Sequence, residues 1–182
     1  ASGRIHNSKM KKIISAGRLV PWKGFPTLIK IMKSLPEWQL IIAGDGPMKN
    51  ELKTLIEELN LEDRVKLVGA IPREKLLTEL QASDLFVLNT SFESFSFQTV
   101  EAMNLGIPVI TTNIGNLKEI VENDKEGILI EPNNREQMLS AIKKIDEDKN
   151  FRDSITRNAK KKSEKFSIES TLNHLTEVMA KL

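Results

Sequence analysis

The sequence predicts an α/β fold in which helices cover both faces of a doubly wound parallel sheet. Six short apolar runs alternate with amphipathic helical patterns between about residues 12 and 146. The runs are continuously apolar rather than alternating, which is typical of strands buried on both faces. Strands and helices that alternate along the chain indicate βαβ units with right-handed crossovers.

The six predicted strands are runs of three or four residues. They are Ile13–Ala16, Leu40–Ala43, Val65–Val68, Leu85–Leu88, Val109–Thr111 and Ile128–Ile130. Open sheets of this class bind ligands outside the carboxyl ends of their strands, at the point where the strand order reverses. The loops that follow the strands are therefore the candidate functional loops.

Helical spacing of apolar residues separates the strands. The patterns cover residues 27–33, 49–59, 74–82 and 136–145, with leucine or isoleucine recurring three and four positions apart. Asn116 and Glu119 resemble a capping box, which predicts a helix start at Asn116.

The segment after residue 150 contains no strand pattern. It reads as two helices, 150–165 and 167–182. The second carries an apolar stripe that suits packing either on its own domain or on a partner: Leu172, Leu175, Val178, Met179 and Leu182.

Composition excludes several classes of protein. The 182 residues favour one core, and 40% hydrophobic with 29% charged residues is ordinary for a globular chain. A net charge of +2 argues against a dedicated nucleic-acid binder. The absence of cysteine excludes a disulfide scaffold and a thiol nucleophile, and fits a cytoplasmic location. No apolar run approaches the roughly 18 residues of a membrane span.

Two early loops carry charge or glycine at the ligand edge. Arg18 and Lys23 stand five residues apart in the loop that opens with Gly17, and a guanidinium with an ammonium suits a diphosphate. A pair of solvated surface cations fits equally well. The turn around Gly46 could approach a phosphate, but it lacks the full dinucleotide or P-loop spacing, so an ordinary βα turn is the simpler interpretation.

The stretch after the fourth strand is the most informative. Glu93 is expected on the loop and Glu101 inside the following helix, with seven residues between them. The start of that helix, around residues 96–98, offers free N–H groups and a positive dipole end to an anion. Carboxylates bind vicinal hydroxyls, so the stretch predicts a sugar, a phosphate and a second sugar along one pocket. Two unrelated glutamates are the alternative, because this spacing is common by chance.

Several stretches match, in order and spacing, the motifs of one known family over about residues 12–145. They are Gly17–Leu19 with Lys23-Gly24, Ile42–Pro47, Val68-Gly69, Asp84–Glu93, Glu101–Ile110, Gly115–Val121 and Gly127–Pro132. The chain resembles retaining glycosyltransferases of the GT-B architecture, family 4 type, whose signature is E-x7-E. Ser94, Ser96 and Asn116 stand where that family usually has glycine, and the two serines stiffen a loop that must approach the donor.

The resemblance implies one half of a two-domain enzyme. In that family a C-terminal Rossmann-like domain with strand order 3-2-1-4-5-6 binds the nucleotide-sugar, and an N-terminal domain binds the acceptor. We expect a disordered or linker tail over 1–11, the donor domain over 12–149, and helices over 150–182 that pack toward the absent partner domain. The full-length enzyme is expected to be metal-independent, and a peripheral membrane protein is an open possibility for it.

The resemblance also assigns roles to residues. Arg18 and Lys23 would hold the diphosphate and stabilise it as it leaves, Glu93 would contact the donor sugar, and Glu101 would bind the ribose. The catalytic set is thus Arg18, Lys23 and Glu93. The remaining donor-binding residues are Gly17, Gly46, Ala70, Ile71, Ser94, Phe95, Ser96, Phe97 and Gln98, with Ala70 and Ile71 at the base. No Asp-x-Asp motif lies in these loops, so no metal is expected.

Two other classes of function remain open from the sequence. One is a GT-B relative such as a nucleotide-sugar 2-epimerase or a sugar phosphorylase. The other is a non-catalytic module that binds a nucleotide. The donor nucleotide is expected to be UDP or GDP, and the sugar and acceptor are not specified by these motifs.

Overall fold

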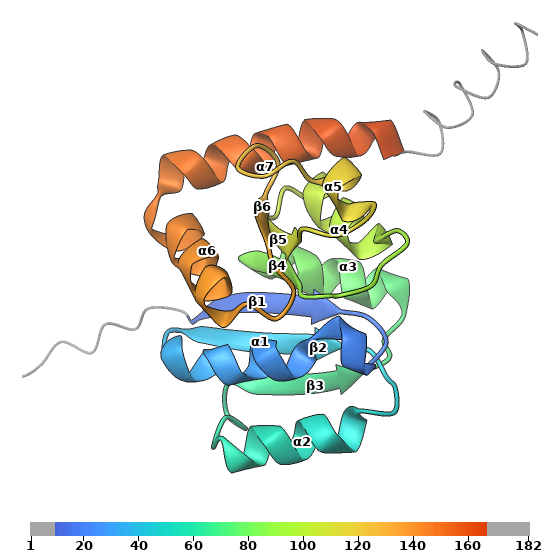
Figure 1. Cartoon of the computed structure of the whole chain (residues 1–182), viewed down its shortest axis with the longest axis vertical. Coiled ribbons are helices and arrows are strands. Elements are labelled where there is room, and N and C mark those ends of the chain that lie inside the picture. The colour runs from blue at the N-terminus through green and yellow to red at the C-terminus, as the bar shows by residue number, and fades with distance from the viewer. Residues whose placement is uncertain (1–9, 167–182) are drawn as a thin grey trace, which may run out of the picture.

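A single six-stranded sheet organises the computed structural model, which describes residues 10–166 (Figure 1). Its order is β3-β2-β1-β4-β5-β6, and every neighbouring pair is parallel. The predicted Rossmann-like, doubly wound sheet and its strand order are therefore confirmed. The strands are β1 Lys11–Ala16, β2 Trp38–Ala43, β3 Val65–Gly69, β4 Leu85–Leu88, β5 Val109–Thr112 and β6 Ile128–Ile130.

Helices follow the strands in the alternation that the sequence predicts. They are α1 Phe25–Ile31, α2 Lys49–Glu58, α3 Arg73–Gln81, α4 Phe97–Asn104, α5 Leu117–Ile120, α6 Arg135–Glu147 and α7 Lys149–Ser163. Three 3₁₀ turns add Pro21–Lys23, Met32–Ser34 and Glu164–Phe166. Each element lies within a few residues of its predicted position. Residues 1–9 and the second predicted tail helix, with its apolar stripe, lie outside the described residues.

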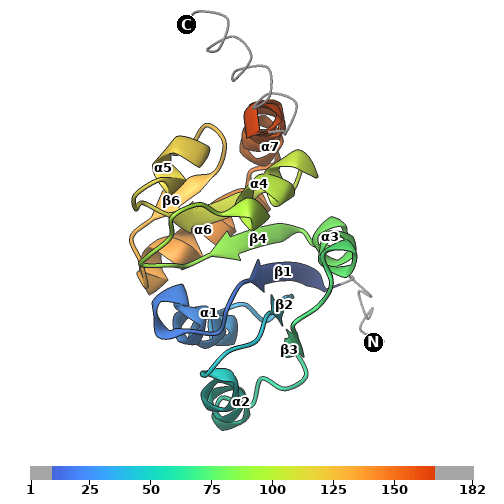
Figure 2. The ribbon, with the colours of Figure 1, turned by 90° about the vertical axis from the view of Figure 1, so that its right-hand side faces the viewer.

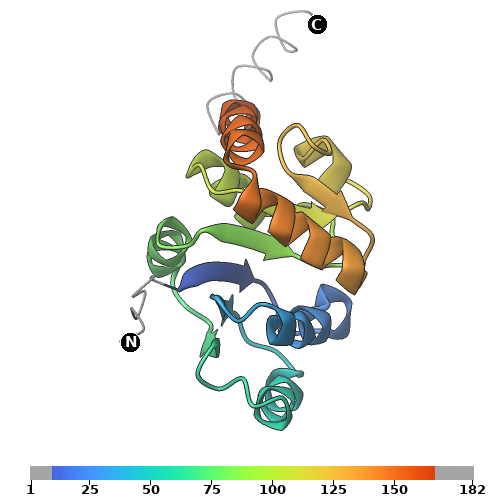
Figure 3. The same ribbon diagram turned by 90° about the vertical axis from the view of Figure 1, so that its left-hand side faces the viewer.

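The sheet has one apolar core on each face. Helices α1, α2 and α6 cover one core, whereas α3, α4 and α5 cover the other (Figures 2 and 3). Adjacent residues of a strand point to opposite faces, so Ile13 joins the first core and Ile14 the second, both with no exposed surface. Continuous apolarity in the strands follows from this burial on both sides. Helix α7 reaches both cores through Ile155 and Ala159.

The first two loops at the carboxyl edge pack directly on each other. A Cβ on Gly44, which has φ +149, would lie 1.9 Å from the Gly17 carbonyl oxygen. A Cβ on Gly46 would lie 2.5 Å from the Leu19 carbonyl oxygen. These glycines are needed because backbone meets backbone there, which fixes the loop after β1 against the loop after β2.

The helix start predicted at Asn116 is confirmed, because Asn116 is the N-cap residue of α5, but the predicted capping box is wrong. Asn116 has helical dihedral angles and its side chain makes no capping hydrogen bond to α5. Instead Asn116 Nδ2 donates to the Ser94 carbonyl oxygen over 2.6 Å. A local sequence signal was overridden because a longer-range acceptor is available.

We expect Gly44→Ala to destabilise the fold far more than Gly69→Ala. Gly69 also has a positive φ, +73, but nothing lies within 4 Å of its virtual Cβ. Backbone strain alone should lower the free energy of unfolding of Gly69→Ala by about 1–2 kcal/mol. Gly44→Ala adds a backbone overlap and should lose about 3 kcal/mol or more. Urea denaturation measures both, and equal losses would contradict the close packing of these loops.

Candidate functional site

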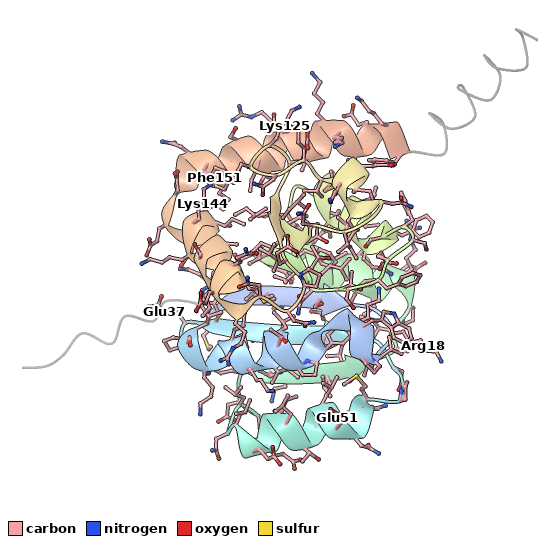
Figure 4. All side chains as sticks on the ribbon, in the orientation of Figure 1. Arg18, Glu37, Glu51, Lys125, Lys144 and Phe151 are labelled. Atoms are coloured by element: carbon pink, nitrogen blue, oxygen red, sulfur yellow. The ribbon has the colours of Figure 1, made fainter. Side chains whose placement is uncertain are left out.

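The candidate site lies at the carboxyl edge of the sheet, where a small cavity of about 200 Å³ opens between the loops. Its lining includes Gly17 and Arg18 from the loop after β1, Ala70 and Ile71 from the loop after β3, and Gln98 from α4. All five are residues that the sequence assigns to the donor. Figure 4 shows Arg18 at the edge where the strand arrows of Figure 1 end, and Glu37 at the opposite edge.

A larger cavity of about 970 Å³ adjoins the first between α3, α4 and the end of α7. Ile71 and Gln98 line both cavities. The lining of the larger one also includes Arg73, Phe97 and Glu101. A ligand that spans the two cavities would pass from the Arg18 loop to the carboxylate of Glu101.

Lys23 and Glu93 form an ion pair between the loops after β1 and β4. Both side chains are largely covered, with 13% and 14% of their surface exposed. The Lys23 stem passes about 3.6 Å from the virtual Cβ of Gly17, which lines the small cavity, although Lys23 is not itself among the lining residues. The sequence names both residues but does not predict that they pair.

Glu101 is paired as well, with Arg73 at the start of α3. Arg73 Nε donates to Glu101 Oε1 over 2.7 Å. Glu101 thus faces the larger cavity, while Glu93 lines neither cavity and is held by Lys23. The structure thus places one of the two carboxylates, Glu101, at a cavity, and a contact of both with one ligand stays a prediction. Sequence reasoning missed Arg73, although its place two residues after Ile71 is a signal that a cation stands near the predicted base site.

The serines that depart from the family pattern have structural roles. Ser96 is 1% exposed and is the N-cap of α4, where its Oγ accepts from the Thr99 N–H over 3.2 Å. Its hydroxyl is thus engaged in the fold, and a contact of Ser96 with the donor stays a prediction. The carbonyl of Ser94 is held by Asn116. The loop between them is fastened at both ends.

The beginning of α4 keeps its anion-binding character. Phe97 and Gln98 lie in its first turn, where N–H groups have no intrahelical acceptor. Phe95 lies edge-on to Phe97 with ring centroids 4.9 Å apart, and also faces Phe166 at 6.0 Å. Phe95 therefore supports the helix start from below, whereas Phe97 is 69% exposed in the larger cavity.

A buried asparagine that the sequence analysis missed holds the loops together. Asn89, 1% exposed, donates from Nδ2 to the Gly24 carbonyl oxygen over 2.9 Å. Its Oδ1 accepts from the Asn133 N–H over 2.8 Å. Thr90 Oγ1 donates to the Trp22 carbonyl oxygen over 3.1 Å. These bonds fix the Lys23 loop beside the end of β4 and so place Lys23 next to Glu93.

Asp45 adds a negative charge to the small cavity that the sequence analysis did not weigh. A hydrogen bond from Lys49, and then one from the Gly46 N–H, lower the pKa of Asp45 below its ordinary value. Gly46 itself does not line either cavity and instead packs on Leu19, so its assignment to the donor is not supported by contact.

The chain does contain one Asp-x-Asp triplet, but away from these loops. It is Asp146–Asp148, at the end of α6, where Asp146 Oδ1 accepts from Lys11 Nζ over 2.6 Å. Lys11 begins β1, so the triplet lies at the opposite edge of the sheet. Residues 10–166 contain no cluster of three acidic or histidine side chains placed to hold a metal ion. In the same part of the chain, no helix is both long and apolar enough to cross a bilayer.

Known proteins are similar in sequence to this chain over most of its length. The family described as Glycosyl transferases group 1 matches residues 3–162. An uncharacterised glycosyltransferase of Methanocaldococcus jannaschii is 32% identical over 154 residues, which are 83% of this chain and 40% of that protein. A putative colanic acid biosynthesis glycosyltransferase of Escherichia coli K12 is 34% identical over 150 residues, which are 75% and 37%. The chain thus spans about 40% of the length of these curated relatives.

Solved structures share the fold. The Anabaena protein HepE, in complex with UDP and glucose, has a TM-score of 0.87 at 28% identity, over 96% of this chain and 49% of that one. The C-terminal domain of a group 1 glycosyl transferase, LpcC of Francisella tularensis, has a TM-score of 0.77 at 25% identity, over 87% of each chain.

The motifs, the fold and the family match agree over the same residues. Three of the motif stretches, Gly17–Leu19, Ile42–Pro47 and Glu101–Ile110, contribute lining residues to the two adjoining cavities. From these findings together we conclude that the chain belongs to the group 1 family of glycosyl transferases.

Proposed function

We propose that this chain is the nucleotide-sugar-binding domain of a retaining GT-B glycosyltransferase of the family 4 type. The full-length enzyme would transfer a hexose from a UDP- or GDP-linked donor to an acceptor held by a second domain. The observation that carries the proposal is the convergence of Arg18, Ile71 and Gln98 on one cavity, with Glu101 in the adjoining one. The fold shared with HepE, whose structure holds UDP and glucose, supports it.

In this proposal the diphosphate occupies the small cavity. Arg18 is exposed and lines this cavity at the edge of the sheet, and Lys23 stands beside Gly17. The N–H groups at the start of α4 complete a positive surface. The leaving phosphate gains charge in the transition state, so fixed positive groups lower the barrier more than they tighten ground-state binding. No metal is proposed, because these cations supply that charge.

The two carboxylates would hold the two sugars. Glu101 accepts hydrogen bonds from the ribose hydroxyls, while the base lies against the backbone of Ala70 and Ile71. Glu93 contacts the donor sugar once Lys23 turns to the phosphate, because one ammonium cannot fully serve both anions. The Lys23–Glu93 pair would therefore keep both side chains in place before the donor arrives.

A second domain would complete the site. Retaining transfer on one face of the donor requires the acceptor hydroxyl beside the leaving phosphate, and the acceptor wall is a separate surface. Trp22, Phe92 and Phe97 are exposed by 44%, 70% and 69%. Trp22 lies in the 3₁₀ turn after β1, Phe92 in the loop after β4 and Phe97 at the start of α4, so all three are at the carboxyl edge of the sheet. Large apolar side chains exposed together favour a contact with another protein surface. For the full-length enzyme a cytoplasmic location, with or without peripheral contact with a membrane, stays a prediction.

Glu101→Ala should weaken the binding of a nucleoside diphosphate by about 1.5–3 kcal/mol, roughly 10- to 150-fold, if both hydrogen bonds to the carboxylate are lost. Calorimetry with UDP, GDP and ADP measures this. Glu51 lies on α2 (Figure 4) and lines neither cavity, so Glu51→Ala removes the same charge and should change nothing. Failure of the wild-type chain to bind any of the three would contradict every nucleotide-based function, including a 2-epimerase and a passive sensor.

Lys23→Ala should weaken the binding of UDP by about 1.5–3 kcal/mol, because the substitution removes a hydrogen bond to a charged group. The substitution should leave the affinity for uridine almost unchanged, since uridine carries no phosphate. Competition binding with both ligands gives the two affinities. An equal loss for UDP and uridine would mean that Lys23 supports the fold of the site rather than the diphosphate.

The 182-residue chain should bind donor without transferring sugar. Orientation of the acceptor is worth up to about 7–11 kcal/mol in well-oriented systems, and this chain alone would lack it. Transfer to added acceptors, followed with radiolabelled UDP-sugars and GDP-sugars, tests this. Robust sugar transfer by the chain on its own would refute the need for a second domain. Nucleotide binding in the absence of transfer would distinguish one half of an enzyme from a chain that is simply inactive.

A further inference from the structure

Arg73 is a charged residue at the site to which neither the sequence motifs nor the comparisons give a role. It begins α3, three residues after Ala70, and its Nε donates to Glu101 Oε1 over 2.7 Å. The Arg73 side chain is 76% exposed, while that of Glu101 is 17% exposed. Both line the 970 Å³ cavity. Arg73 is therefore hydrogen-bonded to the Glu101 carboxylate within the cavity that a ligand would enter.

We infer that Arg73 limits the affinity of the site for a nucleotide, because it competes with the ligand's ribose for Glu101. The inference rests on the proposed ribose-binding role of Glu101. Two vicinal hydroxyls bind a carboxylate best when they reach both of its oxygens. With Oε1 taken by the guanidinium, a ribose has to displace Arg73 before it makes both hydrogen bonds.

The geometry of the pair suits displacement. Only Nε contacts Glu101, so the pair is a single hydrogen bond and not the bidentate fork in which arginine binds carboxylates most strongly. An ion pair with so exposed a guanidinium contributes a factor of about one to five in stability. A ribose that makes two hydrogen bonds to the carboxylate therefore outcompetes Arg73, whereas a single hydroxyl gains little over it.

The effect of this competition on a nucleotide depends on whether its sugar carries both ribose hydroxyls. A nucleotide with both ribose hydroxyls displaces Arg73, and the released guanidinium turns to solvent. A nucleotide that lacks both hydroxyls leaves Arg73 on Glu101 and gains nothing from the carboxylate. Arg73 thereby lowers the affinity of ligands that carry the diol and leaves the affinity of ligands without it unchanged, with no contact to the phosphates or the base.

The test compares Arg73→Ala with Lys75→Ala. Lys75 is exposed on the same helix and has no ion-pair partner within residues 10–166, so its replacement removes the same charge without freeing Glu101. Calorimetry uses UDP and 2′,3′-dideoxy-UDP, or the guanosine pair if GDP is the tighter ligand. Relative to Lys75→Ala, we expect Arg73→Ala to bind UDP about two- to five-fold more tightly. The dideoxy ligand should bind the two variants equally.

Each other outcome overturns the inference. Weaker UDP binding by Arg73→Ala than by Lys75→Ala would make Arg73 a direct ligand contact. Equal UDP binding by the two variants, or an equal gain for the dideoxy ligand, would mean that Arg73 does not compete with ribose. These failures leave the proposed function intact as long as Glu101→Ala weakens UDP. If Glu101→Ala has no effect, the proposed ribose site fails and the inference fails with it.

Discussion

The parallel pairing of β1 with β4 is the constraint on which the rest of the site depends. It places the loops that leave these two strands side by side, although Lys23 and Glu93 are 70 residues apart in sequence. Asn89 then bonds one loop to the other from a buried position at the end of β4. With that pairing fixed, α4 begins over the edge of the sheet, and Arg18 and Gln98 come to face one cavity.

Most of the fold can be read from the sequence because each strand is covered on both faces. Pairs such as Ile13 and Ile14 make that burial visible as an uninterrupted apolar run. The capping box predicted at Asn116 was wrong because the partner of the Asn116 side chain is not local in the sequence. An Asn followed by Glu at the third position is a local signal, but the Asn116 side chain bonds the Ser94 carbonyl from a different loop. Only the folded chain brings that acceptor within reach.

The site was predictable in its members but not in its pairings. Arg18, Gln98 and Glu101 stand in motifs that follow strands, and Ile71 stands in the loop directly after β3, so their shared edge follows from topology. The partner of each charge depends on the relative placement of separate loops and helices, which the motifs do not encode. Arg73 shows this most clearly, because it belongs to no motif and meets Glu101 only through the packing of α3 beside α4.

The fastening of the loop between Ser94 and Ser96 has a consequence for how broadly such a site recognises sugars. Ordering one backbone residue costs about 1–2 kcal/mol of conformational entropy, and more for glycine. A glycine-rich loop becomes ordered, and loses this entropy, only when the ligand binds, so it can adjust its shape to the ligand. Here Asn116 holds the Ser94 carbonyl and Ser96 caps α4, so the cost is met when the chain folds. The loop gives up adaptability for a preset shape, which, under the proposed function, favours a narrow set of donor sugars over a broad one.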